Sequence, residues 1–302
     1  MFDLIIIGGG PSGLTAAIYA TRYKLKTLLV AKTVGGAMAD AHTIENFPGI
    51  ENISGIELAE RMRKQAESLG VEILEEAAQS VGKGPKGFFV NGKLESKYIL
   101  FCLGTKRNPL KLARERELIG KGLSYCATCD APFYKERIVG VVGGGDAAVM
   151  AAELLALYAR KTYLIVREEE LMAQPFVAER ILSNKRVEPM FNVTVAQLFG
   201  EGKLEKIRLS TGNELELDGL FVEIGSTPLT ELAKRLGVGL DLEGYIIVDQ
   251  NMATSVKHVY AAGDATTHNA KWRQIVIACA EGALASRSIY EDTKKGAKNV
   301  QG

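Results

Sequence analysis

Apolar residues in this chain gather in short β-rich runs, each followed by a segment with helical spacing of apolar positions. The segment DLIIIGGGPSGLTAAIYATR, residues 3–22, passes from such a run through glycines into a helical pattern. The segment RIVGVVGGGDAAVMAAELLAL, residues 137–157, repeats the same succession. A second β-rich run follows each segment, LKTLLVA after the first and KTYLIVR after the second. The pattern therefore predicts two βαβ units.

Both strand-to-helix turns carry small residues at the spacing of a dinucleotide-binding loop. The first glycine permits the tight turn, the second lets a pyrophosphate approach the backbone, and the third position needs a small residue for packing. These positions are Gly8, Gly10 and Gly13 in the first copy and Gly143, Gly145 and Ala148 in the second. A βα turn without a ligand is the alternative for either copy alone. Because the motif recurs in the same context, it favours two dinucleotide sites.

The order of the remaining segments predicts how the two units are arranged. Late in the chain, the short apolar run HVYAAG ends at Gly263 and is followed by Asp264, an acid suited to a ribityl hydroxyl or a group beside a phosphate. We interpret this run as a strand that returns to the first domain. The expected fold class is α/β, with two Rossmann-like dinucleotide-binding domains, the second inserted into the first. We expect residues 1–112 and 238–302 to form the first domain and residues 113–237 the inserted one, with a hinge near Leu112 and Gly239.

Composition narrows the possible partners. The chain has 302 residues, 47% of them hydrophobic, which is enough for a sizeable core. Its 37 Lys and Arg balance 36 Asp and Glu, and no long basic run occurs, so we expect neither nucleic acid nor a membrane surface as a partner. The first residues, MFDLIIIGGG, lack a basic segment and a cleavage site, so a cytoplasmic location is expected.

Four cysteines are too few for a secreted disulfide scaffold in a chain of this length. Cys126 and Cys129 have C-x-x-C spacing, which fits either a redox pair or half of a zinc site. The three histidines are scattered singly along the chain, so a redox role is favoured and no metal is expected. Cys102 and Cys279 lie in apolar segments and are interpreted as small core residues.

Taken together, the motifs resemble those of low-molecular-weight thioredoxin reductases. The segments GGGPSGLTAAIYATR, ENFPG, CATCD, GGGDAA, FVEIGSTP and YAAGDA with RQI occur in the family's order and spacing, and CATCD before the second Gly-rich turn is the most specific. The resemblance spans nearly the whole chain. It implies a homodimeric flavoprotein with FAD in the discontinuous domain and a nicotinamide cofactor in the inserted one. It also implies that the substrate is the disulfide of a small thioredoxin-like protein.

The resemblance also assigns cofactor-binding residues. For FAD it implies Gly8, Gly10, Pro11, Ser12, Gly13, Gly36, Asn46, Gly263, Asp264, Arg273, Gln274 and Ile275. For the nicotinamide cofactor it implies Gly143, Gly145, Asp146, Ala147, Ala148, Arg167 and Glu168. Two positions depart from the family pattern: Ala37 stands where glutamine is common and Trp272 where tyrosine is common. These departures concern the packing of the flavin.

The catalytic roles follow from the resemblance together with the chemistry of dithiol exchange. By resemblance, Cys129 is the thiol next to the flavin and Cys126 the thiol that attacks the protein substrate. Asp130 adjoins the pair and is the nearby group able to give and take the proton that exchange requires. A helix N-cap is the alternative role for this aspartate, and one residue can serve both purposes.

The expected electron donor departs from the family. The usual arginine cluster that neutralises the 2′-phosphate of NADPH is replaced by VREEELMAQ, in which Arg167 remains but Glu168 and Met172 stand at the other arginine positions. A carboxylate at this strand end suits a free ribose hydroxyl, so NADH is favoured over NADPH. A solvated turn without a ligand is the alternative for the glutamates, above all Glu169 and Glu170. A different electron donor is a further possibility.

Three other functions share parts of this pattern. Ferredoxin reductases of the same fold lack the redox cysteines, so Cys126 and Cys129 argue against that function. A nucleotide-sensing protein without catalysis would leave the dithiol and its neighbouring acid unexplained. A glutaredoxin-like or peroxidase-linked partner would use the same dithiol, and the sequence does not separate it from thioredoxin.

Overall fold

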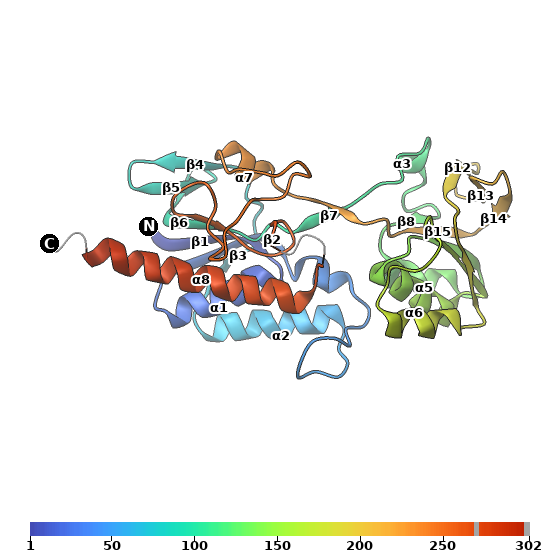
Figure 1. Ribbon diagram of the computed structural model, residues 1–302, viewed down its shortest axis with the longest axis horizontal. Coiled ribbons are helices and arrows are strands. Elements are labelled where there is room, and N and C mark those ends of the chain that lie inside the picture. The colour runs from blue at the N-terminus through green and yellow to red at the C-terminus, as the bar shows by residue number, and fades with distance from the viewer. Residues whose placement is uncertain (269–271, 299–302) are drawn as a thin grey trace. The chain divides into compact units, whose positions relative to one another are not determined.

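The computed structural model of the protein describes residues 1–268 and 272–298 (Figure 1). The chain divides into two compact units. Unit 1 contains residues 1–106 and 227–302, and unit 2 contains residues 107–226. Each unit is built on a largely parallel sheet with helices, which confirms the predicted α/β class. Within the described part of the chain, no helix has the length and apolar character needed to cross a membrane.

The inserted unit is shorter than the sequence predicted, spanning 107–226 rather than 113–237. Helix α7 (Glu231–Arg235) belongs to unit 1 because Ala233 and the following Leu236 pack in the same core as strand β1. Leu112 packs against the core of unit 2. The connections between the units are β7 (Thr105–Arg107) and β16 (Ser226–Pro228), which pair with each other. Leu112 and Gly239, near which the sequence predicted a hinge, lie outside these two connections.

Unit 1 contains a seven-stranded sheet of order β3-β2-β1-β6-β5-β4, and β17 also pairs with β6. Its strands are β1 (Phe2–Gly9), β2 (Thr27–Val34), β3 (Glu72–Leu74), β4 (Val81–Gly84), β5 (Gly87–Val90), β6 (Leu94–Phe101) and β17 (Val259–Ala261). Strand β1 is buried on both faces, as expected for the centre of a parallel sheet. The parallel pairing of β17 with β6 confirms that the late strand returns to the first domain.

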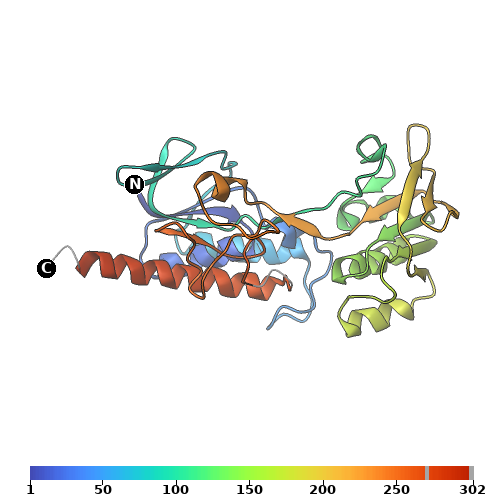
Figure 2. The same cartoon turned by 45° about the horizontal axis from the view of Figure 1, so that its top comes forward.

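The long helices of unit 1 cover one face of this sheet (Figure 1, Figure 2). The helices of the unit are α1 (Pro11–Arg22), the 3-10 helix η1 (Gly36–Asp40), α2 (Gly55–Ser68), α7 and α8 (Ile275–Lys298). Helix α2 begins with a capping interaction in which Glu57 N donates to Ser54 Oγ. Helix α8 packs closely on α1 because a Cβ atom on Gly282 would lie 2.2 Å from the Ser12 carbonyl oxygen. Ser286 Oγ donates to the Ala16 carbonyl oxygen in the same contact.

Unit 2 contains a five-stranded parallel sheet of order β11-β10-β9-β15-β8 and a three-stranded antiparallel sheet β12-β13-β14. Its strands are β8 (Leu123–Ser124), β9 (Ile138–Val142), β10 (Lys161–Ile165), β11 (Val187–Met190), β12 (Val195–Phe199), β13 (Lys206–Leu209), β14 (Glu214–Glu216) and β15 (Gly219–Val222). Its helices are α3 (Glu115–Leu118), α4 (Ala127–Asp130), the 3-10 helix η2 (Ala131–Tyr134), α5 (Asp146–Tyr158) and α6 (Pro175–Leu182). The strand order reverses between β9 and β15. Open α/β sheets bind ligands in the crevice at the carboxyl ends of the strands where such a reversal occurs.

Candidate functional site

The turn between β1 and α1 uses its three glycines for different physical reasons. A Cβ atom on Gly8 would lie 2.0 Å from the Cys102 carbonyl oxygen, and one on Gly13 would lie 1.9 Å from the Gly8 carbonyl oxygen. The nearest atom to a Cβ on Gly10 would be the Gly36 Cα atom, at 4.0 Å. Packing within the protein therefore accounts for Gly8 and Gly13. At Gly10, the missing side chain leaves room for a ligand at the helix start.

A cavity of about 460 Å³ opens at this turn within unit 1. Nine of the residues assigned to FAD line it: Gly8, Gly10, Pro11, Ser12, Gly36, Asp264, Arg273, Gln274 and Ile275. The cavity is also lined by Met38, Leu103, Thr105 and Leu229, which the sequence analysis missed. These four belong to no motif, and only the folding of distant segments brings them to one cavity.

Three residues assigned to FAD do not line the cavity but lie next to residues that do. Gly13 is buried beneath the turn. Gly263 has a φ of 85°, and a Cβ atom there would lie 2.6 Å from Ser12 Oγ, so glycine is required on both conformational and steric grounds. Asn46 Nδ2 donates to Gln274 Oε1 at 3.0 Å and so orients a side chain of the cavity wall.

The polar groups of the cavity suit a flavin dinucleotide. The start of α1 offers backbone N–H groups and space at Gly10, which fits a pyrophosphate. Asp264 lines the same cavity and offers acceptor oxygens to hydroxyl donors. Burial raises the pKa of Asp264 to about 6, and the negative charge of Glu281 adds to the effect. A ligand hydroxyl that donates to Asp264 would favour its ionised form.

The second Gly-rich turn, between β9 and α5, repeats the division of roles seen in the first. A Cβ atom on Gly143 would lie 2.2 Å from the Glu223 carbonyl oxygen and 2.9 Å from the Ala148 Cβ atom. No described atom lies within 4 Å of the position that a Cβ on Gly145 would take. Packing requires the first small residue, while the second leaves open space beside the start of α5. The geometry fits a second dinucleotide.

The loop that follows β10 is attached to this turn. Both carboxylate oxygens of Asp146 accept hydrogen bonds from Gln174, at 2.7 Å from its backbone N–H and 2.9 Å from its side chain. Met172 N donates to the Gly144 carbonyl oxygen at 2.8 Å. Asp146 thus orders the loop, while its neighbour Ala147 is exposed at the first turn of α5.

Arg167 and Glu168 form an ion pair at the end of β10. The guanidinium donates to Glu168 Oε1 from Nη2 at 2.7 Å and from Nε at 3.0 Å. Glu168 Oε2 lies beside the Gly-rich turn, 3.8 Å from where a Cβ of Gly144 would be. The turn therefore carries a carboxylate at the edge where the ribose of a dinucleotide is expected. Glu169 and Glu170 are exposed, which fits a solvated turn for these two.

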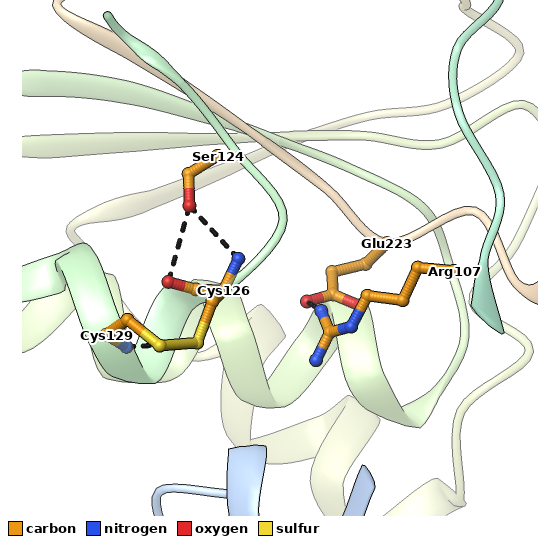
Figure 3. A network of polar contacts seen from close by, with 5 residues as sticks. All are labelled: Arg107, Ser124, Cys126, Cys129 and Glu223. Carbon is orange, nitrogen blue, oxygen red and sulfur yellow. Dashed lines mark hydrogen bonds and ion pairs between the residues drawn. A yellow bond between two sulfur atoms is a disulfide. The ribbon is translucent and has the colours of Figure 1, made fainter. Parts of the chain in front are cut away.

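Cys126 and Cys129 form a disulfide at the short helix α4 in unit 2 (Figure 3). Cys129 N donates to Cys126 Sγ at 3.2 Å, and Cys126 N donates to Ser124 Oγ at 3.0 Å. Ala127 anchors the helix in the core of the unit, while Cys129 is exposed. The disulfide is thus anchored to the core through Ala127, and its Cys129 side is accessible to a reaction partner.

Asp130 ends α4 immediately after the disulfide. Its side chain is half-buried and makes no capping hydrogen bond to η2, so the structure does not support the capping alternative. Its negative charge reaches the Tyr134 hydroxyl, whose pKa is raised first by burial and then by Asp130. Asp130 directly follows Cys129 in the sequence, and its carboxylate makes no cap at this helix end.

An ion pair that the sequence analysis missed joins the first connector to the sheet of unit 2. Arg107 Nη1 donates to Glu223 Oε1, and only 8% of the Glu223 side chain is exposed (Figure 3). Glu223 follows β15, and its carbonyl oxygen lies at the second Gly-rich turn. The signal in the sequence was a glutamate within the apolar run FVEIG, at the carboxyl end of a strand.

The two free cysteines, Cys102 and Cys279, lie in protected surroundings. Cys102 is buried beneath the first turn, and burial raises the pKa of its thiol to about 12, as expected for a core residue. Burial also raises the pKa of the half-buried Cys279. Among residues 1–268 and 272–298, no group of three His, Cys, Asp or Glu side chains is arranged to hold a metal ion.

Comparison with known proteins gives a consistent result over nearly the whole chain. A family described as pyridine nucleotide-disulphide oxidoreductase matches residues 2–282. Thioredoxin reductase of Listeria innocua is 37% identical over 301 residues, covering 96% of this chain and 93% of that protein. Thioredoxin reductase of Peptoclostridium acidaminophilum is 38% identical over 302 residues, covering 95% of both chains.

Two solved structures with a closely similar fold are also thioredoxin reductases. The crystal structure of T. acidophilum thioredoxin reductase matches with a TM-score of 0.91 and 34% identity, covering 97% of this chain and 98% of that one. The Lactococcus lactis thioredoxin reductase matches with a TM-score of 0.92 and 31% identity, covering 96% of this chain and 98% of that one.

Proposed function

Because the chain belongs to the pyridine nucleotide-disulphide oxidoreductases and, among them, to the low-molecular-weight thioredoxin reductases, we propose a specific route for its electrons. They pass from a nicotinamide cofactor, NADH in preference to NADPH, through FAD to the Cys126–Cys129 disulfide. The resulting dithiol reduces the disulfide of a thioredoxin-like protein. The observation that carries this proposal is the half-exposed disulfide beside Asp130, in the same unit as the second Gly-rich turn.

The residues of unit 1 fit FAD. The start of α1 would hold the pyrophosphate, and Asp264 would accept hydrogen bonds from ribityl hydroxyls. Arg273 and Gln274 line the same cavity from the segment before α8. Bound there, the flavin supplies a carrier that takes two electrons from a hydride donor and passes them to a disulfide.

The chain's own groups support the exchange steps at the cysteines. When the disulfide is reduced, the Cys129 N–H that already donates to Cys126 Sγ would stabilise negative charge on that sulfur. Cys126 then attacks the partner's disulfide, and Cys129 resolves the mixed disulfide, which restores the Cys126–Cys129 bond. Asp130 follows Cys129 directly in the sequence and would give and take the proton in this exchange.

The ion pair between Arg167 and Glu168, at the second Gly-rich turn, supports the preference for NADH. A 2′-phosphate would approach the carboxylate of Glu168 and meet an arginine that this carboxylate already binds. A free ribose hydroxyl would instead find an acceptor in Glu168 Oε2.

The two reactions of the flavin require different parts of unit 2. The disulfide and the second Gly-rich turn belong to unit 2, and the flavin cavity belongs to unit 1. The disulfide and the bound nicotinamide cofactor would therefore react with the flavin in alternation. We assign the movement to the paired connectors β7 and β16, where few residues would have to change conformation. Assembly as a homodimer and a cytoplasmic location remain predictions.

The test is an anaerobic titration of the purified flavoprotein. We expect NADH to bleach the flavin absorbance more efficiently than NADPH, and an oxidised thioredoxin to restore it. The same titration with a glutaredoxin-like protein compares the alternative partners. If neither nucleotide bleached the flavin while the dithiol still cycled with an artificial reductant, another electron donor would have to replace the nicotinamide cofactor.

A further inference from the structure

A buried glutamate on α8 contacts the turn that carries Asp264. The side chain of Glu281 is only 3% exposed. Its Oε2 atom accepts a hydrogen bond from Gly263 N at 2.7 Å and another from Thr266 Oγ1 at 3.2 Å. His268 Nδ1 lies 3.2 Å from the other oxygen, Oε1. A carboxylate this deeply buried needs such donors, and here both Gly263 N and Thr266 Oγ1 come from the segment that follows β17.

The turn held by Glu281 forms part of the flavin cavity. Gly263 adopts a positive φ and contacts Ser12, and the next residue, Asp264, lines the cavity. Glu281 does not line the cavity itself, so it would act on a bound flavin only through the turn and through its charge.

We propose that Glu281 is a positioning residue for the flavin, which holds the Gly263–Asp264 turn against the cavity and whose charge makes FAD retention depend on pH through Asp264. This inference rests on the proposed binding of FAD in unit 1. Hydroxyl donors of the ligand prefer the ionised Asp264, whereas the nearby Glu281 charge disfavours that form. Affinity for FAD should therefore fall as Asp264 takes up a proton.

Other groups around Glu281 need to be distinguished from Asp264. From the segment after β6, the Cys102 thiol faces Glu281, and burial keeps it protonated below about pH 12. From α1 the neighbouring group is the Ser12 side chain, which is uncharged. From the turn after β17, His268 is the second group to consider, because its ring nitrogen lies 3.2 Å from Glu281 Oε1.

The experiment measures the FAD dissociation constant of flavin-free protein between pH 5 and pH 8 by quenching of flavin fluorescence. Wild-type protein should bind FAD about tenfold more weakly at pH 5 than at pH 7, as one proton with a midpoint near pH 6 requires. Glu281→Gln keeps an acceptor for Gly263 N but removes the charge. In this variant, the pH at which affinity declines should shift downward by about half a unit or more.

Two control variants make the result decisive. Glu291→Gln removes an exposed charge from the same helix and should leave the pH profile unchanged. His268→Gln should also keep the pH midpoint of FAD binding. Because His268 is more exposed than Glu281, this variant tests whether Asp264 or His268 takes up the proton even if Glu281→Gln does not fold. An unchanged midpoint in a folded, FAD-binding Glu281→Gln protein, or loss of the pH dependence in His268→Gln, would overturn the inference. Failure of wild-type protein to bind FAD would instead contradict the proposed function.

Discussion

The Arg167 guanidinium donates two hydrogen bonds to the same carboxylate oxygen of its neighbour Glu168. The one arginine that remains of the expected 2′-phosphate cluster is therefore already bound by an acid. The second oxygen of that acid lies beside Gly144 in the turn where a dinucleotide would bind. The proposed preference for NADH therefore depends on this ion pair.

Replacing Glu168 and Met172 by arginine should recover NADPH use. Charge-assisted hydrogen bonds contribute roughly 1.5 to 3 kcal/mol each, so the ratio of kcat/KM for NADPH to NADH should rise at least about tenfold. Stopped-flow flavin reduction with each nucleotide measures that ratio. Glu170→Arg, which makes the same charge reversal as Glu168→Arg at an exposed neighbour, is the control. A wild-type preference for NADPH would mean that residues outside this segment bind the phosphate.

Serine at either redox cysteine should abolish disulfide reduction and leave flavin binding intact. Cys126→Ser and Cys129→Ser each remove one sulfur of the disulfide, while the FAD cavity belongs to the other unit. Turnover with an oxidised thioredoxin and the flavin absorbance per chain measure the two properties separately. Full turnover in either variant would exclude the dithiol route.

The local motifs identified residues that line one cavity, but they did not identify the domain boundaries. Gly8, Gly13 and Gly143 could be identified because close contacts restrict those positions to glycine or a small residue. Gly10 and Gly145 could be identified from the motif spacing, because a dinucleotide would need the space that their missing side chains leave. The boundary near residue 237 was wrong because the packing of Ala233 against the core of unit 1 is a long-range contact without a local pattern.

Glu281 and Glu223 were missed for a related reason. Glu281 lies in the helical segment ACAEGALAS and Glu223 in the strand-like FVEIG, where an isolated acid looks like a surface position. Their partners, Gly263 and Arg107, are 18 and 116 residues away along the chain. Only the tertiary fold shows that the charges are buried and compensated.

Asp130→Asn should slow dithiol–disulfide exchange and leave flavin reduction by the nucleotide largely unchanged. Loss of a general acid typically costs a factor on the order of 100 or more, and the asparagine cannot transfer the proton. Rapid-mixing experiments with reduced enzyme and oxidised thioredoxin measure the exchange rate across the pH range. Glu136→Gln, which removes an exposed charge nearby, should have little effect. An unchanged exchange rate at every pH would leave Asp130 without a catalytic role.

Asp264→Asn should stabilise the flavin-free protein at neutral pH while weakening FAD binding. The pKa of Asp264 is raised from 3.8 to about 6 by burial and by Glu281, so the unfolded chain releases this proton at lower pH than the folded chain. As the pH rises from about 4 to about 6, the free energy of unfolding therefore decreases, by up to about 3 kcal/mol. The asparagine variant avoids this loss, because its side chain carries no charge at any pH.

Urea unfolding of the flavin-free proteins at pH 4 and pH 8 checks the sign. The variant should be more stable than wild-type protein at pH 8, and the difference should nearly vanish at pH 4. Glu51→Gln, at an exposed position, should show no such pH dependence. Equal stability of Asp264→Asn and wild-type protein at pH 8 would mean that the Asp264 carboxylate is better solvated or paired than its burial implies. The aspartate would then impose no cost on the flavin-free fold, and its proposed linkage to FAD affinity would lose its physical basis.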